Sequence, residues 1–203
     1  MREHRIAIID YGMGNIGSVQ NMLKKLGYKS TIAQDEAALN LATHLILPGV
    51  GSFDVAMTRL EELALVEPIR HQVLTLKKPI IGICLGMQLL GKSSQEGIKE
   101  GLNLLGFDCL KFPSNTLKVP NMGWNEVTPQ NNSILIDELY SDARYYFVHS
   151  YYVPLSEEYT VLRASYGLTY TAALNRDNIY GTQFHPEKSH RYGMQILSNF
   201  LKA

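Results

Sequence analysis

The segment PIIGICLGMQLL at residues 79–90 decides the fold of this 203-residue chain. It opens with a short apolar run that is typical of a buried strand and that leads directly into Cys84. Gly82 and Gly86 stand two positions before and after that cysteine, which is the thiol version of the nucleophile elbow. The pattern predicts a buried strand, a sharp turn that carries Cys84 above the edge of a sheet, and a helix over residues 85–90.

Strand-like and helix-like segments alternate through the N-terminal half of the chain. Short apolar runs predict strands at residues 5–10, 30–33, 44–47 and 79–83. Helical spacing and helix-capping residues predict helices at residues 15–26, 35–41, 52–63 and 67–76. Apolar strands separated by amphipathic helices indicate right-handed crossovers and a parallel sheet that is covered on both faces.

The C-terminal half has a different pattern, with strands that follow one another closely. Strand-like runs occupy residues 108–111, 144–148, 160–164, 171–174 and 179–184. A hairpin turn is predicted at residues 175–178, and a final helix at 191–201. We therefore expect an α/β fold with a mixed, mostly parallel central sheet, flanking helices and a C-terminal antiparallel extension. No repeat or linker divides the sequence, so we expect one domain over residues 1–203.

The composition excludes several classes of protein. The chain has 19 basic and 19 acidic residues, so its formal net charge is zero and it lacks the basic patch expected of a nucleic-acid-binding protein. It has no apolar run of about 20 residues and no signal-peptide pattern. Its two cysteines, Cys84 and Cys109, are too few for a disulfide scaffold or a cysteine-based zinc site. We expect a cytoplasmic protein with no metal and no membrane association.

Residues 12–17, GMGNIG, match the G-x-G-x-x-G pattern between a first strand and a first helix. That pattern is typical of a dinucleotide site, and Asp35 lies where the ribose-binding acid would stand. Tyr11 and Met13 add bulk beside the turn, however, and the pattern contains few fixed residues. The alternative is a tight turn in which glycine lets two backbone segments approach.

Cys84 is a candidate nucleophile. The N-terminus of the helix that follows it would favour a thiolate, and the Leu85 amide could donate to a developing oxyanion. The alternative is a buried structural cysteine at the end of a strand.

A thiol nucleophile needs a base, and the base needs a group that orients it. His185 follows the last strand-like run, and Glu187 stands two residues later, after a proline that keeps the segment extended. His149 also lies near a strand end and is the rival base. We favour His185 because only it has a nearby carboxylate. Pro48-Gly49-Val50-Gly51, after the third predicted strand, could turn its backbone N–H groups toward an oxyanion.

Together these segments resemble the class I (triad) glutamine amidotransferases. The resemblance is nearest to the branch formed by the glutaminase subunits of imidazole glycerol phosphate synthase, and it spans nearly the whole chain. The residues that carry it are IAIIDYGMGN (6–15), LPGVGSF (47–53), GICLGMQLL (82–90), MGWNEV (122–127), YYFVHSYY (145–152) and QFHPEKS (183–189). The resemblance makes the glycine pattern a turn packed near residues 48–51, with no NAD and no other cofactor implied.

The resemblance also implies a role for each site residue. Cys84 would attack the side-chain amide of glutamine, His185 would move the proton, and Glu187 would orient the imidazole. The oxyanion would lie at the backbone of Val50, Gly51 and Leu85. The positions that hold the amino-acid end of glutamine are Gln88, Glu96, Ser150 and Tyr151, and among them Glu96 suits the α-ammonium group by charge.

In the family, the ammonia passes to a (β/α)₈ cyclase subunit, which forms imidazole glycerol phosphate and an aminoimidazole carboxamide ribotide in histidine biosynthesis. The resemblance implies a heterodimer with that subunit. The predicted interface residues are Asn121, Trp124, Asn125, Tyr146 and Lys188. Asn121 stands where the family usually has histidine, and Gly91, Lys92 and the segment 188–194 also depart from the usual pattern. These departures favour an alternative acceptor, a sugar amidotransferase that serves surface-polysaccharide synthesis.

Overall fold

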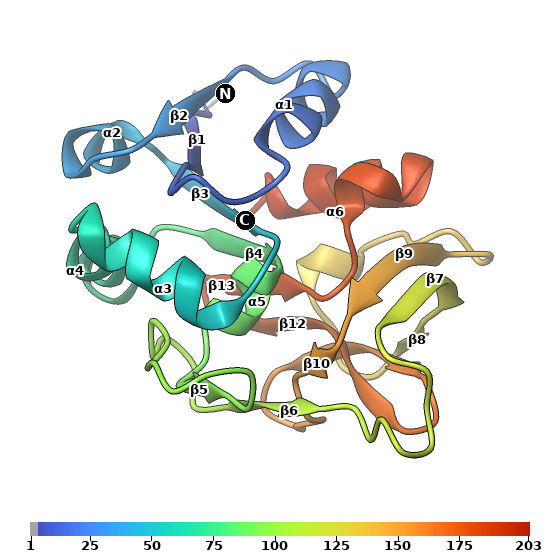
Figure 1. Cartoon of the computed structure of the whole chain (residues 1–203). Helices are drawn as coiled ribbons and strands as arrows, with labels where there is room; N and C mark the ends of the chain where they lie inside the picture. Colours follow the sequence, from blue (N-terminus) through green and yellow to red (C-terminus); the bar gives the residue numbers. More distant parts are fainter. Residues whose placement is uncertain (1–3) are drawn as a thin grey trace.

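The computed structural model describes residues 4–203, and its largest sheet has eight strands in the order β2-β1-β3-β4-β13-β12-β11-β8. Residues 1–3, the start of the predicted domain, lie outside the described residues. Five neighbouring strands of this sheet run parallel (Figure 1). They are β2 (Ser30–Ala33), β1 (Ile6–Ile9), β3 (His44–Gly49), β4 (Ile80–Cys84) and β13 (Ile179–Thr182). The predicted parallel core is therefore confirmed.

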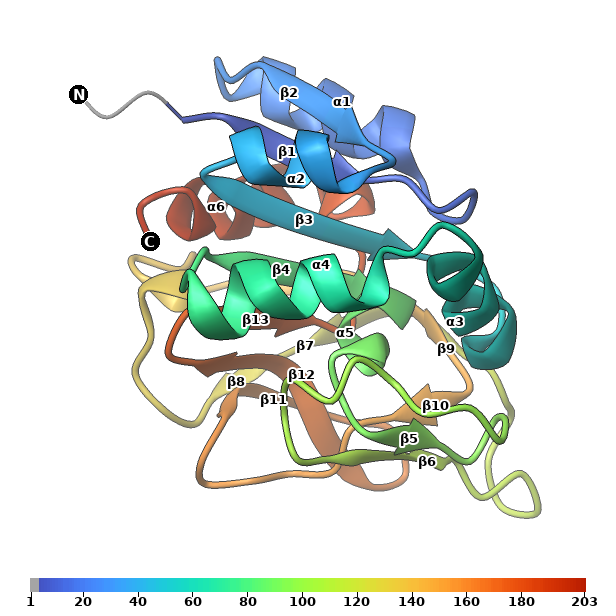
Figure 2. The ribbon, with the colours of Figure 1, turned by 90° about the vertical axis from the view of Figure 1, so that its left-hand side faces the viewer.

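Helices cover both faces of the parallel strands (Figure 2). One face carries α1 (Ile16–Lys25) and α6 (His190–Phe200). The other carries α2 (Glu36–Leu41), α3 (Phe53–Glu62) and α4 (Val66–Arg70). Helix α4 continues as a π-helix, η1 (His71–Thr75), where the sequence predicted one regular helix. The short helix α5 (Leu85–Leu89) follows β4 directly.

The two faces of the sheet bury different residues of the same strand. In β1, Ile6 and Ile8 belong to the core cluster beneath α1 and α6, whereas Ala7 and Ile9 belong to the cluster beneath α2 and α3. Successive side chains of a strand point to opposite faces, so a strand covered on both faces is mostly apolar along its length. This requirement explains why the predicted strands contain unbroken apolar runs.

The predicted antiparallel extension is also confirmed. It contains β11 (Thr160–Ser165), β12 (Thr169–Arg176) and the two-residue edge strand β8 (Thr128–Pro129). Strands β12 and β13 form a hairpin in which Arg176 pairs with Ile179. Asp177 in that turn has a φ of 52°, a left-handed conformation that aspartate adopts more readily than most residues.

Two smaller sheets lie beside the extension, and the sequence predicted only part of them. One pairs β7 (Asn121–Glu126) with β9 (Arg144–His149), and the other joins β10 (Tyr151–Tyr152), β6 (Asp108–Lys111) and β5 (Ser93–Ser94). Strand β7 was not predicted because its sequence, NMGWNE, contains glycine and asparagine, which are rare in strands. Two single-turn 3₁₀ helices, η2 (Ile134–Ile136) and η3 (Pro186–Lys188), complete the described elements. Within residues 4–203, the helices are all too short or too polar to cross a membrane.

Candidate functional site

Cys84 lies at the turn between β4 and α5, with φ 55° and ψ −108°. Residues other than glycine rarely adopt a positive φ, and such strain occurs mainly at functional sites. The two flanking glycines allow the turn. A Cβ atom on Gly86 would lie 1.8 Å from the carbonyl oxygen of Leu47, and one on Gly82 would lie 2.5 Å from the carbonyl oxygen of Gly86. The predicted elbow is thus present, and only glycine fits at either flank.

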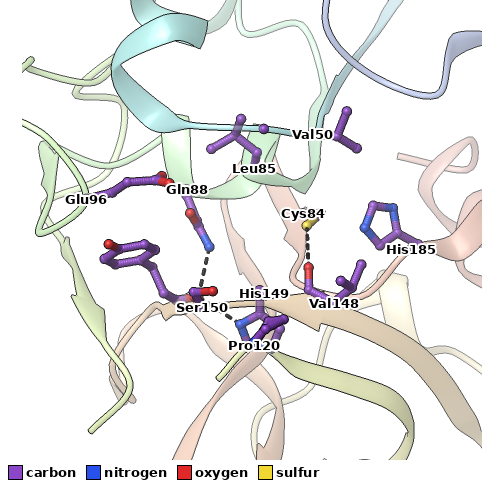
Figure 3. A pocket seen from close by; sticks show the side chains of 12 residues that line it. Val50, Cys84, Leu85, Gln88, Glu96, Pro120, Val148, His149, Ser150 and His185 are labelled. Atoms are coloured by element: carbon purple, nitrogen blue, oxygen red, sulfur yellow. Dashed lines mark hydrogen bonds between the residues drawn. The ribbon is translucent and has the colours of Figure 1, made fainter. Parts of the chain in front are cut away.

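The Cys84 side chain faces a cavity of about 280 Å³. Figure 3 shows Cys84 and His185 at one end of it, with Gln88 and Glu96 at the other. The residues that line the cavity are Val50, Gly51, Cys84, Leu85, Gln88, Glu96, Pro120, Val148, His149, Ser150, Tyr151 and His185. The structure therefore brings together the predicted nucleophile, base, oxyanion residues and the residues for the amino-acid end of glutamine, which come from five separate segments of the chain. Among the predicted site residues outside the interface, only Glu187 does not line the cavity.

Glu187 lies behind His185. The His185 Nδ1 atom is 2.8 Å from Glu187 Oε1, and both side chains are almost completely buried. Burial alone would lower the pKa of His185, but the Cys84 sulfur and the Glu187 carboxylate raise it from 6.5 to about 10. The His185 Nε2 atom is buried and makes no hydrogen bond within residues 4–203. With this raised pKa the imidazole is protonated at neutral pH, so Nε2 carries a proton that it can give to a group in the cavity and later take back.

The backbone of His185 is held by strand β9. Its N–H donates to the Tyr146 carbonyl oxygen at 2.9 Å, and its carbonyl oxygen accepts from the Ser189 hydroxyl at 2.7 Å. The Ser189 hydroxyl in turn accepts from the Tyr146 N–H at 3.0 Å. These three bonds fix the imidazole relative to β9, and the sequence contained no signal for Ser189.

His149, the rival base, also lines the cavity, but both of its ring nitrogens are occupied. Its Nδ1 atom lies 2.7 Å from the Tyr151 carbonyl oxygen, which can only accept, so Nδ1 carries the proton. The Nε2 atom accepts from Asn121 Nδ2 at 3.2 Å. Burial lowers the pKa of His149 to about 4. A neutral imidazole with two satisfied nitrogens is poorly suited to proton transfer, which favours His185.

The Tyr11 side chain anchors the start of the loop that follows β3. The buried Tyr11 hydroxyl donates to the Pro48 carbonyl oxygen at 2.8 Å. Burial raises the pKa of Tyr11, so this hydroxyl remains a donor at neutral pH. Gly51 has a φ of 99°, and Val50 is 40% exposed at the mouth of the cavity. The loop is thus fixed at Pro48, whereas at Gly51 its backbone has the conformational freedom of glycine.

The glycine pattern at residues 12–17 packs against this same loop. A Cβ atom on Gly14 would lie 3.1 Å from the Pro48 side chain, and one on Gly51 would lie 2.7 Å from Met13. Gly17, in contrast, has open space around it. In a dinucleotide motif the third glycine permits close packing between helix and strand, and that contact is missing at Gly17. The geometry agrees with a turn that packs on residues 48–51.

The far end of the cavity is formed by polar side chains with fixed partners. Gln88 Nε2 donates to the Tyr151 carbonyl oxygen at 2.9 Å and to Gln183 Oε1 at 3.1 Å. Gln183 Nε2 lies 3.8 Å from Cys84 Sγ, so it connects the two ends of the site. Sequence reasoning assigned no role to Gln183, although it belongs to the QFHPE segment. Glu96 Oε2 accepts from the Phe53 N–H at 2.9 Å, and burial raises the pKa of Glu96.

Three of the five predicted interface residues, Trp124, Tyr146 and Lys188, lie on one surface beside the site. Trp124 is 44% exposed, and its ring packs at 6.2 Å from Tyr146 and stacks at 5.6 Å on His190. Lys188 Nζ lies 5.7 Å above the ring of Tyr146. Asn125 is partly exposed, but it is the neighbour of Trp124 on β7, so its side chain points to the opposite face, where it donates to the Ser165 carbonyl oxygen.

The structure corrects the prediction for Asn121. Its side chain is only 5% exposed and donates to His149 and to the Tyr170 hydroxyl. Asn121 and Trp124 are three residues apart on a strand, so their side chains point to opposite faces. Asn121 therefore supports the wall of the cavity instead of facing an interface.

No metal-ligating cluster is found among residues 4–203: His, Cys, Asp and Glu side chains nowhere gather in groups of three or more that could hold an ion. The chemistry available at the cavity is that of a strained thiol beside an imidazole with a raised pKa. Such a pair suits nucleophilic attack on a carbonyl carbon.

Comparison with known proteins matches residues 7–203 to the family "Glutamine amidotransferase class-I". The sequence is 49% identical to imidazole glycerol phosphate synthase subunit HisH 2 of Methanococcus maripaludis, over 97% of this chain and 98% of that protein. It is 46% identical to HisH 2 of Pseudomonas aeruginosa, with the same coverage, and 44% identical to HisH of Leptospira interrogans, over 96% of this chain and 98% of that protein.

Solved structures share the fold at lower identity. A PurLQS structure from Thermotoga maritima superposes with a TM-score of 0.73 at 19% identity, covering 98% of each chain. A glutamine amidotransferase from the same organism gives a TM-score of 0.64 at 17% identity, covering 100% of this chain and 82% of that one.

Proposed function

Because the chain belongs to the class I glutamine amidotransferase family, we propose that it is a glutaminase subunit that hydrolyses glutamine and channels the ammonia to a partner subunit. The observation that carries the proposal is the cavity that Cys84 and His185 share, with Glu187 hydrogen-bonded behind the imidazole. The HisH names of relatives at 44–49% identity support imidazole glycerol phosphate synthase as the complete enzyme.

The reaction begins with the proton of the Cys84 thiol already on His185 Nε2, which has no other hydrogen-bond partner in the described chain. The sulfur then forms a bond to the side-chain carbonyl carbon of glutamine. Negative charge develops on the former amide oxygen, and the Leu85 N–H and the backbone at Val50 and Gly51 stabilise it. His185 returns its proton to the nitrogen, the C–N bond breaks, and ammonia leaves.

A thioester between Cys84 and the glutamyl group remains. Water attacks its carbonyl carbon, His185 accepts the proton of that water, and the thiol leaves as glutamate is released. Glu187 keeps the imidazole in one orientation and stabilises its charged form through both halves of the cycle. Gln88, Glu96, Ser150 and Tyr151, which all line the cavity, hold the amino-acid end of glutamine. Gln88 and Glu96 lie at the end of the cavity away from Cys84 (Figure 3).

Replacing the nucleophile tests the chemistry. Cys84→Ala should abolish glutamate production in the presence of the partner, measured by an enzyme-coupled glutamate assay. Cys109→Ala is the matched control, because Cys109 is buried outside the cavity and burial raises the pKa of its thiol. If Cys84→Ala folds and produces glutamate at the wild-type rate, the proposed mechanism is wrong.

The proposed partner is a (β/α)₈ cyclase subunit, bound as a heterodimer through the surface of Trp124, Tyr146 and Lys188. The exposed Trp124 beside Lys188 supports this choice, because aromatic and basic side chains often dominate interface energetics. The product pair would be imidazole glycerol phosphate and an aminoimidazole carboxamide ribotide. Mixing the chain with a histidine-pathway cyclase and its ribulosyl substrate should give glutamine-dependent product.

A second acceptor is favoured by the positions at which the sequence departs from the usual family pattern. These positions are Asn121, Gly91, Lys92 and the segment 188–194. That acceptor is a sugar amidotransferase of surface-polysaccharide synthesis, supplied with ammonia by the same glutaminase chemistry. Ammonia transfer to such a synthetase, with no turnover alongside the cyclase, would reject the histidine-pathway assignment and keep the glutaminase assignment.

A further inference from the structure

Two carboxylates tie the start of helix α3 to the loop that carries Glu96. Glu96 Oε2 reaches from the loop to the helix and accepts from the Phe53 N–H at 2.9 Å. Ser52, the residue at the N-cap position, makes no capping bond through its own side chain. The first turn of α3 is therefore capped by a residue that lies 43 positions away in sequence.

The second carboxylate reaches in the opposite direction. Asp54, on the first turn of α3, accepts from the Ile98 N–H with both oxygens, at 3.1 and 3.0 Å, and from the Lys99 N–H at 3.0 Å. These bonds lower the pKa of Asp54, so its carboxylate stays ionised well below neutral pH. Charge-assisted bonds from backbone N–H groups hold a loop more firmly than neutral ones.

The loop is also shaped to fit Asp54. A Cβ atom on Gly97 would lie 1.9 Å from Asp54 Oδ1, so only glycine can pass this close to the carboxylate. Ile98, at the tip of the loop, is 97% exposed and cannot anchor it by apolar packing. The backbone bonds to Asp54 consequently hold residues 97–99, immediately after Glu96, against the helix.

We propose that Asp54 is a positioning residue for glutamine: by fixing residues 97–99 it holds the Glu96 carboxylate where it meets the substrate's α-ammonium group. This inference rests on the proposed glutaminase function and deepens it. Asp54 does not line the cavity and has no part in proton transfer, so its effect is on substrate binding. Its negative charge beside Glu96 also makes that end of the cavity more attractive to a cation.

Steady-state kinetics of the partner-activated complex test the proposal. Asp54→Ala should raise KM for glutamine about tenfold and change kcat by no more than about twofold, because misplacing an orienting group by an ångström can cost up to about 100-fold. Asp54→Asn keeps the size of the side chain and one oxygen acceptor, so it should give a smaller rise. Glu62→Ala is the matched control, because Glu62 lies on the exposed end of the same helix and pairs only with Arg59.

Two further measurements separate positioning from a general loosening of the site. Glutaramate, which is glutamine without its α-amino group, should inhibit wild-type and Asp54→Ala complexes with the same Ki within about twofold. In the Glu96→Gln background, Asp54→Ala should add little to KM, because residues that act through one another are not additive. An unchanged KM, an equal loss of glutaramate binding, or additive effects would each overturn the proposal. A wild-type complex without glutaminase activity would instead reject the proposed function.

Discussion

The His185 Nδ1 atom and the Glu187 Oε1 atom lie 2.8 Å apart, and both side chains are removed from solvent. The pair is made by residues two positions apart, with Pro186 between them beginning the turn η3. A carboxylate in this position stabilises the protonated imidazole, and together with the Cys84 sulfur it overcomes the opposite effect of burial on the pKa of His185.

Glu187→Gln should change how stability depends on pH. The pKa of His185 is raised to about 10 in the folded chain, against about 6.5 in the unfolded chain. Its contribution to stability is therefore fully present below about pH 6.5 and is lost as pH rises toward 10. In Glu187→Gln the pKa of His185 is raised less, so the free energy of unfolding should fall less as the pH rises from 6.5 to 9.5. Urea denaturation at pH 6.5, 8 and 9.5 measures this difference.

Glu62→Gln provides the control for that experiment, because Glu62 is an exposed carboxylate that pairs with Arg59. It should follow the wild-type curve. Identical slopes for wild type and Glu187→Gln would show that the carboxylate does not set the proton affinity of His185.

Tyr11→Phe should loosen the loop that precedes Val50. The substitution leaves the buried Pro48 carbonyl oxygen without its donor, which should cost about 1–3 kcal/mol of stability. Because the loop supplies part of the proposed oxyanion site, kcat should fall more than KM rises. Thermal denaturation and steady-state kinetics measure the two effects, with the exposed Tyr140→Phe as control. A stable variant with full kcat would argue against a role for Tyr11.

Gly86→Ala and Gly17→Ala should have opposite effects on the stability of the fold, although both add one methyl group. At Gly86 the new Cβ atom would collide with the Leu47 carbonyl oxygen on β3, which cannot move without breaking the sheet. We expect little folded protein. At Gly17, on α1, the space is open, and alanine should stabilise the helix by about 0.5–1 kcal/mol. Circular dichroism of the purified variants compares them, and a destabilised Gly17→Ala would contradict the packing described for residues 12–17.

His149→Gln should make the chain less sensitive to acid. Burial holds the pKa of His149 at about 4 in the folded state, against about 6.5 unfolded, so stability falls as pH drops from about 6.5 to 4. Burial also lowers the pKa of His44, so His44 makes the same contribution to acid sensitivity in the wild type and in the variant. Urea denaturation at pH 7, 5.5 and 4.5 should show a smaller loss for His149→Gln than for the exposed control His71→Gln. Parallel curves would contradict a neutral, buried His149.

Much of the site could be predicted because its strongest signals are local. The two glycines around Cys84 and the two-residue spacing from His185 to Glu187 are constraints within a single turn of backbone. Apolar runs likewise predicted the parallel strands, because a strand buried on both faces is made mostly of apolar residues.

The sequence alone left other features open because they depend on which segments become neighbours. His185 reaches Cys84 because β13 pairs with β4, although the paired residues Ile80 and Ile179 are 99 positions apart along the chain. Asn121 points inward and Trp124 outward because one face of the β7–β9 sheet packs on Tyr170 of β12, and NMGWNE does not indicate which face that is. The carboxylates of Asp54 and Glu96 each satisfy backbone groups of the other's segment, a relationship with no pattern in sequence.

The sequence by itself determined the elbow at Cys84, the orientation of His185 by Glu187 and the positions of the parallel strands along the chain, since each follows from residues close together in the chain. Only the tertiary structure decided what the glycines of residues 12–17 do. The same G-x-G-x-x-G turn can hold a pyrophosphate or pack on protein, and here the Pro48 side chain lies against Gly14. Backbone conformation is a local property, whereas the group that occupies the space beside it is set by the packing of distant segments.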